Sequence, residues 1–534
     1  MVNDTVAFPT LTEEEIQILR PYGAEATFHD GESLWNAGDV DFCFFVILSG
    51  SAVIRNTFGP TEQIAVHGPG QFSGDVDVMS GRPAPVGGYA QGETKVLQLS
   101  AEDLREVVRV EQNLGGKILT AFVRRRELLL DSNSHGLLVL GSPLDPATTA
   151  IRTFLGRNRV VHRWNTPEDE HTSSIFTAFG LTPADTPLVI LGDRYFINPS
   201  LEELGTLLGV RRDTDKHQYD LVIVGAGPAG LAAAVYGASE GLQTLLLDRS
   251  GPGGQASWSS RIENYMGFPE GLTGSDLAAR GLIQAQKFGA EISVPAEVIK
   301  IECNSHGQVL HLASGETIDA RAVLVATGAT YQKLRVPGFD DFETRGVFYA
   351  ATRLESDFCK DSEVIVVGAG NSAGQAAVFL SQTAKRVRLI VRGDQLNKSM
   401  SDYLSYRVEQ IPNIDVLLET EVAGLQGDTK VRSATLTGKK EGSIPCDGLF
   451  VFVGATPNTG FLRDTVAQDR KGFIITGDAT GSQWHSERIP FYLETSCPGM
   501  FAAGDCRVGS VKRVASSVGE GSMAVTFIHR FLSL

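Results

Sequence analysis

Hydrophobic and polar positions divide the chain into three parts, and the first covers residues 1–132. There, short apolar runs separated by glycine predict strands at 42–48, 51–54 and 95–99. A short helix is predicted at 13–19, and the spacing within 101–130 predicts one or two helices with a basic end at Arg124–Arg126. Regular strands with glycine turns between them indicate a β-barrel or jelly roll, that is, a β-roll with helices.

The second part, residues 133–212, alternates strands and helices. Apolar runs predict strands at 137–140, 159–164 and 188–191, and helices at 147–155 and 200–208. This alternation indicates an α/β layer structure. The polar stretch 211–217 is a predicted linker to the third part, 218–534, where strand, glycine-rich turn and helix alternate throughout.

The third part opens with a complete βαβ unit around a glycine-rich loop. A strand at 219–224 precedes Gly225-Ala-Gly227-Pro-Ala-Gly230, a helix at 231–239 follows, and the next strand, 242–247, ends at Asp248. In a G-x-G-x-x-G loop the first glycine permits the tight turn, the second lets a pyrophosphate approach the backbone, and the third allows close helix packing. A carboxylate about 20 residues farther on accepts ribose hydroxyls. The unit therefore predicts a dinucleotide site.

A second unit of this kind begins with a strand at 362–367. It continues as Gly368-Ala-Gly370-Asn-Ser-Ala373, a helix to about 382 and a strand at 386–391. Two units imply two dinucleotides, and the usual pair is FAD with NAD(P)H, between which a hydride passes. The second strand ends at Arg392 instead of an acid, which suits a 2′-phosphate and favours NADPH over NADH.

Composition narrows the function classes. The 534 residues include 58 Gly but 22 Pro, which indicates tight turns and phosphate loops more than disorder. A formal net charge of −16 argues against a nucleic-acid partner. No apolar run reaches the roughly 18–20 residues that span a bilayer, and residues 1–15 lack a basic, then apolar, leader pattern. We therefore expect a cytoplasmic protein without a membrane partner.

The cysteines are scattered. None of the six forms a C-x-x-C pair, which argues against a disulfide framework and against a local metal site. The six are Cys43, Cys303, Cys359, Cys446, Cys497 and Cys506.

Motifs over 218–534 together resemble the low-molecular-weight thioredoxin reductase family. They are Gly225–Gly230, Gly254-Gln255, Glu263-Asn264, Ala326-Thr327-Gly328, Gly368–Ala373, Gly448–Phe450, Gly454–Asn458 and Ala502–Asp505. The resemblance implies a homodimer with an FAD domain in two pieces, 213–336 and 446–534, and an inserted NAD(P) domain at 337–445.

The same resemblance assigns cofactor residues. For FAD they are Gly225, Gly227, Pro228, Ala229, Gly230, Asp248, Arg249, Gly254, Gln255, Asn264, Val298, Ala326, Thr327, Gly328, Gly504, Asp505, Arg513, Val514 and Ala515. Among these, Val298 would lie beside the adenine, Asp505 would hold a ribityl hydroxyl, and Arg513–Ala515 would face the flavin. For NAD(P) they are Gly368, Gly370, Asn371, Ser372, Ala373 and Arg392. Only Arg392 matches the family's three NADPH-binding arginines, so NADH use is also open.

The chain departs from the family at the redox dithiol. After Gly346-Val, the two positions of the family's C-x-x-C are Ala350 and Arg353. Neither side chain supplies the thiolate that disulfide exchange requires, so the catalytic thiols are unassigned. Cys359, six residues after Arg353, is more simply a surface or half-buried cysteine than a catalytic one.

The first two parts also carry weakened resemblances. Residues 133–212 resemble a thioredoxin or glutaredoxin domain, with Ser142 and Asp145 in place of its two thiols and Thr186-Pro187 at its cis-proline position. Residues 1–132 resemble a cyclic-nucleotide-binding domain with a degenerate phosphate cassette at 74–83. The family's phosphate-binding arginine follows the cassette proline, but here Ala84 follows, and no neutral side chain replaces a bidentate cation. Arg82 lies two residues before the position of the family's arginine, which Ala84 occupies here. Cyclic-nucleotide binding is thus not expected, and a degenerate regulatory or dimerising domain is favoured.

Three functions remain open on this basis. The favoured one is an NAD(P)H-dependent FAD oxidoreductase that delivers electrons to an external acceptor, a redox protein among the candidates, without an internal dithiol. The first alternative is a thioredoxin-disulfide reductase that uses non-standard or partner thiols. The second is a flavin or NAD(P) redox sensor regulated by the N-terminal domains.

Overall fold

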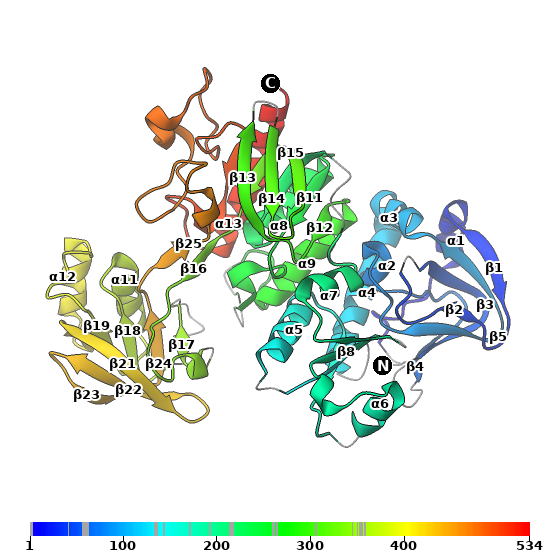
Figure 1. The fold of residues 1–534 in the computed structure, drawn as a ribbon, viewed down its shortest axis with the longest axis horizontal. Coiled ribbons are helices and arrows are strands. Elements are labelled where there is room, and N and C mark those ends of the chain that lie inside the picture. The colour runs from blue at the N-terminus through cyan, green and yellow to red at the C-terminus, as the bar shows by residue number, and fades with distance from the viewer. Residues whose placement is uncertain are drawn as a thin grey trace. The chain divides into compact units, whose positions relative to one another are not determined.

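The computed structural model forms two compact units. The larger combines Met1–Gly328 with Thr459–Leu534, and the smaller is Ala329–Asn458. Both are drawn in Figure 1. The structure describes the chain apart from residues 1–3, 41, 56–62, 133–136, 143–144, 170–171, 192–193, 213–217, 259–261, 263–264, 305–306, 344, 350, 352–355 and 357–358.

The larger unit begins with the β-roll. Its helices are α1 (Glu13–Leu19), α2 (Val76–Ser80), α3 (Ala101–Val110) and α4 (Gln112–Ser132), and its strands are β1 (Ala24–Phe28), β2 (Ser33–Trp35), β3 (Phe44–Arg55), β4 (Gln63–His67) and β5 (Gly87–Leu99). The sheet runs β1-β5-β3-β4, and β2 also pairs with β5. Phe44, Phe72 and Phe122 pack ring against ring in the core, which joins the sheet to α4. The predicted helix at 13–19 is confirmed.

Two expectations for this region are wrong. Ser49-Gly50 does not end a strand, because β3 continues through a bulge there; Gly50 adopts a φ of +80°, which other residues rarely take. Arg124–Arg126 does not end a helix either. The helix α4 runs to Ser132, because Arg125 and Arg126 are buried in its interior and contact carbonyl and carboxylate groups of other elements.

A four-stranded sheet follows in the order β7-β6-β8-β9. Its strands are β6 (Leu137–Leu140), β7 (His162–Asn165), β8 (Leu188–Leu191) and β9 (Arg194–Ile197), and its helices are α5 (Pro146–Arg157), α6 (Thr172–Phe179) and α7 (Leu201–Leu207). Only the β6–β7 pair is parallel. The peptide bond between Thr186 and Pro187 is cis, as the resemblance implied.

The remainder of the larger unit is built on one mixed sheet. Its strands are β10 (Tyr219–Val224), β11 (Thr244–Leu247), β12 (Glu291–Ser293), β13 (Val298–Asn304), β14 (Gly307–Leu312), β15 (Thr317–Val325) and β26 (Met500–Ala502), and its helices are α8 (Pro228–Ser239), α9 (Gly274–Lys287) and α13 (Val514–Leu532). The order is β12-β11-β10-β15-β14-β13, with β26 beside β15, and the sheet is parallel apart from β13 and β14. Alternate residues of β10 face opposite sides, so Leu221 and Ile223 pack with the helices while Val222 and Val224 pack toward the antiparallel β13–β14 pair.

The smaller unit repeats this plan. The chain enters it through β16 (Ala329–Tyr331) and leaves it through β25 (Ala455–Pro457), which pair with each other. Its parallel sheet has the order β17-β24-β18-β19-β20, made of β17 (Val347–Phe348), β18 (Glu363–Val367), β19 (Arg386–Ile390), β20 (Ile414–Leu417) and β24 (Gly448–Val451). Helices α11 (Asn371–Leu380) and α12 (Asp402–Gln410) and a sheet of β21 (Thr420–Gly427), β22 (Val431–Gly438) and β23 (Gly442–Pro445) complete it. This unit encloses the predicted NAD(P) segment 337–445.

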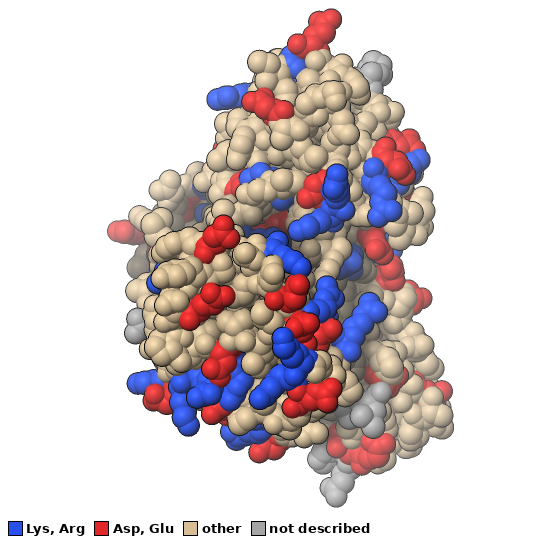
Figure 2. Space-filling view, turned by 90° about the vertical axis from the view of Figure 1, so that its left-hand side faces the viewer, with Lys and Arg blue, Asp and Glu red and all other residues tan. Residues whose placement is uncertain are grey.

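The surface carries mixed charges. Basic and acidic side chains are interspersed over the face shown in Figure 2, and exposed pairs in the smaller unit, such as Arg386–Asp415 and Lys439–Glu419, join the two signs directly. Within the described residues, no helix is both long enough and apolar enough to cross a membrane.

Candidate dinucleotide-binding sites and the placement of the cysteines

The first glycine loop is shaped as a cradle whose outer side is open. A Cβ added at Gly230 would lie 1.8 Å from the carbonyl oxygen of Gly225, so only glycine lets α8 pack this closely on the loop. At Gly227, by contrast, no protein atom lies within 4 Å of an added Cβ. Pro228 starts α8, where a missing N–H costs nothing, and Ala229 packs beneath it. The exposed backbone at a helix N-terminus suits a pyrophosphate.

Asp248 anchors this loop from the end of β11. Its carboxylate accepts hydrogen bonds from the backbone N–H groups of Ala226 at 2.8 Å, Ser250 at 2.8 Å and Gly251 at 2.9 Å. A carboxylate has about four acceptor positions, so Oδ2, which accepts one of these bonds, has room for a ribose hydroxyl. The following residue, Arg249, is exposed.

Two further segments meet the loop because their strands are neighbours. In the parallel part of this sheet, Val325 pairs with Val224 on one side and with Ala502 on the other. The residues that follow, Ala326–Gly328 and Gly504-Asp505, therefore emerge at the same carboxyl edge as the first loop. This edge is where open α/β sheets bind their ligands.

Asp505 is the clearest sign of a missing ligand at this edge. Its Oδ1 atom is buried and has no hydrogen-bond partner in the structure. Burial raises the pKa of Asp505 to about 6, with Lys512 lowering it and Glu520 raising it. A buried unpaired oxygen is costly, and a ribityl hydroxyl placed there would satisfy it. Residues at this edge thus fit the FAD that the sequence predicted.

The sequence interpretation missed the residues that hold Asp505 in place. Glu520 of α13 accepts a hydrogen bond from the Gly504 N–H at 2.7 Å and pairs with the Arg507 guanidinium at 2.6 Å. These contacts tie the loop after β26 to the last helix. No short motif marks them; the available signal was an acid in the second turn of a helix already assigned to the flavin.

The start of α13 is also free for a ligand. Arg513 is its N-cap residue but provides no side-chain cap, and Arg513 and Ala515 are exposed while Val514 is half-buried. Uncapped N–H groups and the positive end of the helix dipole favour negative charge.

Other predicted FAD residues differ in how firmly the structure places them. Gly254 lies against the loop, with an added Cβ 3.1 Å from the Gly227 Cα. Gln255 is exposed. Val298 is buried at the start of β13, two residues after Ala296, whose N–H donates to the Asp248 carbonyl at 2.8 Å. Asn264 lies outside the described residues.

The second glycine loop has the same features. A Cβ at Gly368 would lie 2.6 Å from the Phe452 carbonyl oxygen, whereas at Gly370 nothing lies within 4 Å. Asn371 and Ser372 are exposed at the start of α11, and Ala373 is fully buried under it. The loop can therefore accept a second pyrophosphate.

Arg392 is exposed just after β19, as a residue that contacts a 2′-phosphate must be. The next basic residue in this segment, Lys398, is instead paired with Asp394 at 2.7 Å. Among the predicted NADPH contacts, Arg392 is thus the cation that stays available at the surface.

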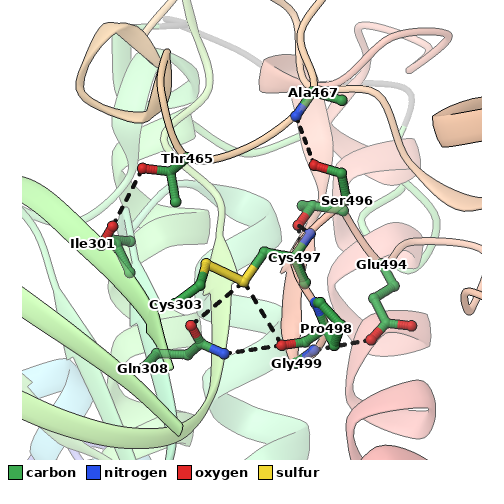
Figure 3. Close-up of a disulfide and its surroundings, with 11 residues drawn as sticks. Ile301, Cys303, Gln308, Thr465, Ala467, Glu494, Ser496, Cys497, Pro498 and Gly499 are labelled. Carbon is green, nitrogen blue, oxygen red and sulfur yellow. Dashed lines mark hydrogen bonds between the residues drawn. A yellow bond between two sulfur atoms is a disulfide. The ribbon is translucent and has the colours of Figure 1, made fainter. Parts of the chain in front are cut away.

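Two cysteines are joined, which contradicts the expectation that the scattered cysteines form no disulfide. Cys303 of β13 is bonded to Cys497, which precedes β26 (Figure 3). Folding brings together residues 194 positions apart in the sequence. Gln308 lies beside the pair, and its amide donates to the Pro498 carbonyl at 2.9 Å. Cys303 is exposed and Cys497 is buried.

This disulfide lies far from the first glycine loop. Cys303 pairs with Gln308, Gln308 with Ala320, and Ala320 with Tyr219, the first residue of β10. The loop follows the last residue of β10, so the two features are at opposite ends of a strand that is roughly 17 Å long. The disulfide therefore cannot exchange electrons directly with a flavin at the carboxyl edge.

The remaining thiols are poorly suited to redox chemistry. Cys43 is half-buried in the β-roll, and burial raises its pKa. Cys359, Cys446 and Cys506 are buried, which corrects the view of Cys359 as a surface or half-buried residue. Burial raises the pKa of Cys506 to about 12 and raises that of Cys446 well above its usual range. A thiol must ionise to react, so neither is a nucleophile near neutral pH. Ala350 and Arg353, at the family's dithiol positions, lie outside the described residues.

At the second vacant thiol pair, Asp145 has a structural role. Its carboxylate caps α5 by accepting from the Thr148 N–H at 2.8 Å and the Thr148 hydroxyl at 2.6 Å. The Thr148 hydroxyl is the main cause that lowers the pKa of Asp145. Ser142 precedes it in the same turn.

The carboxylates of the cassette at 74–83 are paired with a side chain of the protein itself. Arg126 of α4 is buried and pairs with both Asp75, at 2.7 Å, and Asp77. Arg82 donates to the Asn158 carbonyl at 2.9 Å. Both of these arginines are thus engaged by groups of the protein itself. In the described part of the chain, no cluster of three or more His, Cys, Asp or Glu side chains could hold a metal ion.

Two protein-family models match this sequence. The sequence model of the pyridine nucleotide-disulphide oxidoreductase family matches residues 219–521, and that of the cyclic nucleotide-binding domain matches residues 25–111. A thioredoxin reductase of Listeria monocytogenes is 34% identical over 310 residues, which cover 57% of this chain and 91% of that protein. One of Treponema pallidum is 35% identical, with coverages of 57% and 94%. The solved thioredoxin reductase of Streptococcus pyogenes aligns with a TM-score of 0.53 at 32% identity, over 60% of this chain and 99% of that one.

Proposed function

Because the chain belongs to the pyridine nucleotide-disulphide oxidoreductase family, which is a family of enzymes, we propose that it oxidises NAD(P)H with FAD and passes the electrons to an external acceptor. The observation that carries this proposal is the carboxyl edge of the larger unit. There an open glycine loop lies beside Asp505, whose buried oxygen lacks a partner. These two features support binding of a flavin dinucleotide at this edge.

The chain's own residues would bind and orient both cofactors. The backbone at Gly227 would receive the FAD pyrophosphate, Asp248 a ribose hydroxyl and Asp505 a ribityl hydroxyl. The uncapped N–H groups of α13 would stabilise negative charge on the ring system. FAD, when bound, supplies the two-electron chemistry that links a nicotinamide to an acceptor. In the smaller unit, Gly370 and Arg392 would hold NADPH, with NADH as the weaker substrate.

The acceptor is proposed to be external because this chain offers no suitable dithiol. The sequence has no C-x-x-C, the Cys303–Cys497 disulfide lies at the far end of the sheet, and Cys446 and Cys506 are buried with raised pKa values. Since the relatives are thioredoxin reductases, a redox protein is the first acceptor to test. A homodimer in the cytoplasm remains part of the proposal.

Anaerobic rapid mixing tests this directly. The purified chain is reconstituted with FAD and mixed with NADPH or NADH while the visible absorbance of oxidised flavin is followed. We expect that absorbance to fall with either nucleotide, faster with NADPH. If neither nucleotide lowers it, the proposal fails.

A matched variant separates the external acceptor from an internal disulfide. The double substitution Cys303→Ser and Cys497→Ser removes the disulfide without touching the carboxyl edge. Turnover with an external acceptor such as a quinone or a thioredoxin should be unchanged. If turnover is lost while flavin reduction by NADPH is retained, electrons leave through this disulfide, and the external route is wrong.

One set of contacts favours a second function, a sensor regulated by the N-terminal domains. Arg82 of the cassette donates to the Asn158 carbonyl, and the Asn158 amide donates to the Ser250 carbonyl at 3.3 Å. The Ser250 N–H in turn donates to Asp248, the proposed ribose ligand. A continuous series of hydrogen bonds thus joins the cassette to the FAD edge.

Asn158→Ala interrupts this series without touching either end. If the domains are coupled, FAD affinity should change by about fivefold or more, the usual lower range for coupled sites. Asn113→Ala, an exposed substitution on α4, is the control. Equal FAD affinity in both variants would exclude this route of regulation.

A further inference from the structure

We propose that the Cys303–Cys497 disulfide is a site of thiol–disulfide exchange with an external protein dithiol, and that its opening weakens the binding of FAD to the larger unit. The exchange chemistry needs no cofactor and is independent of the proposed function, whereas the effect on FAD rests on that function. Three features of the disulfide carry both statements: the unequal access to its two cysteines, the groups beside the buried sulfur, and the strands that the bond joins.

The two cysteines differ in their access to solvent. Cys303, next to the last residue of β13, is exposed, whereas Cys497, shortly before β26, is 6% exposed. Exchange begins when a thiolate reaches one sulfur of a disulfide, so access decides which sulfur is attacked. The attack therefore occurs at Cys303, and Cys497 is the leaving group.

The exchange proceeds in two steps. In the first, a partner thiolate bonds to the Cys303 sulfur, the bond to Cys497 breaks, and the Cys497 sulfur takes up a proton. In the second, the partner's other thiolate bonds to the partner sulfur of the mixed disulfide, and Cys303 leaves and is protonated. The partner dithiol is oxidised to a disulfide, and this chain gains two electrons and two protons. A dithiol is favoured, because after attack by a monothiol the adjacent Cys497 re-forms the original bond.

Gln308 provides a partner for the buried sulfur in its reduced state. This residue is 2% exposed, and its Nε2 donates to the Pro498 carbonyl at 2.9 Å, which fixes the amide (Figure 3). Its Oε1 lies 3.6 Å from the Cys497 sulfur, and the Pro498 carbonyl oxygen lies 3.8 Å from the same atom. A disulfide sulfur has no hydrogen to donate, whereas a thiol has one. The buried sulfur therefore gains a hydrogen bond when the disulfide opens.

The disulfide joins two strands whose other ends lie near the proposed FAD site. β13 begins at Val298, the predicted neighbour of the adenine, and β26 is followed by the segment that contains Asp505. The bond closes a loop of 194 residues, and such a closure strongly restricts the freedom of the chain. Opening it lets β13 and β26 separate more readily, which loosens both FAD contacts.

Alkylation of the full-length chain tests the exchange. The chain, purified in air, is incubated with reduced thioredoxin as the dithiol probe, labelled with iodoacetamide without denaturant and analysed by mass spectrometry. Cys303 should be labelled after this treatment and unlabelled without it, while the buried Cys359, Cys446 and Cys506 stay unlabelled in both samples.

The buried thiols show whether the chain remains folded during this experiment. If Cys303 is labelled only together with Cys359, Cys446 and Cys506, opening requires unfolding. If Cys303 is never labelled, the bond is inert, and if it is labelled without thioredoxin, the bond is absent in solution. Each of these three results overturns the proposal.

Fluorescence titration of FAD tests the consequence of opening. The thioredoxin-treated chain should bind FAD at least about fivefold more weakly than the untreated chain, the usual lower range for coupled sites. The double substitution Cys303→Ser and Cys497→Ser should give this weaker affinity with or without thioredoxin. Cys43→Ser, which removes a half-buried thiol of the β-roll, should respond as the unchanged chain does. With FAD in excess the site stays occupied, so turnover of the double variant remains unchanged.

The two experiments separate the failure of this inference from that of the proposed function. If the untreated chain binds no FAD, the proposed function fails, and alkylation still decides the exchange site. If it binds FAD equally well with the disulfide open and closed, the link to FAD is wrong.

Gln308→Leu tests the partner of the buried thiol. In a mixture of reduced and oxidised thioredoxin, the equilibrium of this variant should shift toward the closed disulfide by about twofold or more, because the Cys497 thiol loses an acceptor. Gln382→Leu, an exposed substitution in the smaller unit, should leave the equilibrium unchanged. An unchanged equilibrium in Gln308→Leu, or a shift toward the open form, would overturn this role of Gln308.

Discussion

The first glycine loop and the cassette at 74–83 both resemble phosphate-binding motifs, but the loop is open whereas the cassette carboxylates are paired with an arginine of the protein itself. At Gly227 no protein atom lies within reach, and Asp505 beside the loop lacks a partner. In the cassette, Arg126 occupies Asp75 and Asp77, and Arg82 is bonded to Asn158. Whether a phosphate-binding motif is free to bind a phosphate therefore depends on the side chains that neighbouring elements place beside it, as much as on its own residues.

The largest expected effect comes from closing the open loop. Gly227→Val introduces a side chain where a pyrophosphate would lie but where no protein atom is displaced. The variant should fold and lose FAD affinity by about 100-fold or more, because the backbone approach is blocked. Fluorescence titration of free FAD measures it. Gly116→Val, at an equally open position on α4, is the control and should keep normal affinity. Normal FAD affinity in Gly227→Val would remove the contrast between loop and cassette.

The second effect is on the stability of the paired cassette carboxylates. Arg126→Met leaves Asp75 and Asp77 buried without a counter-ion, and removal of one partner of a buried pair costs about 3–5 kcal/mol. Thermal unfolding followed by circular dichroism should show an earlier first transition. Arg109→Met, which removes an exposed pair with Glu106, should cost less than about 1 kcal/mol. If the two variants melt alike, the ion pairs do not stabilise the cassette.

The smallest effect concerns the second glycine loop, which is open but has lost most of the cations expected beside it. Arg392→Gln should lower kcat/KM for NADPH by about 10-fold relative to NADH, because one charge-assisted contact to the 2′-phosphate is lost. Steady-state rates with both nucleotides measure the ratio. Lys398→Gln, whose side chain is already paired with Asp394, should leave the ratio unchanged. If Lys398→Gln lowers the ratio and Arg392→Gln leaves it unchanged, the contact to the 2′-phosphate is made by Lys398 instead.

The sequence predicted an element correctly where the residues that determine it are close together in the chain. The strands that lead into both loops, the glycines and Asp248 occur as expected, since a tight βα turn depends on residues that are adjacent in the chain. The helix at 13–19 was equally clear because its capping box lies within four residues. The run Arg124–Arg126 misled the prediction, because basic residues usually lie at an exposed helix end. Here two of them are buried against distant carbonyl and carboxylate groups.

The sequence by itself determined the two dinucleotide loops, the absence of a C-x-x-C and the loss of the cassette arginine after Pro83. Each of these features depends only on the identity of residues at particular positions in the chain. Only the tertiary structure decided that Arg126 pairs with the cassette carboxylates, that Glu520 and Arg507 hold the segment around Asp505, and that Cys303 meets Cys497. Each of these contacts joins side chains from separate elements, and their energies depend on burial and on distances that no local pattern records.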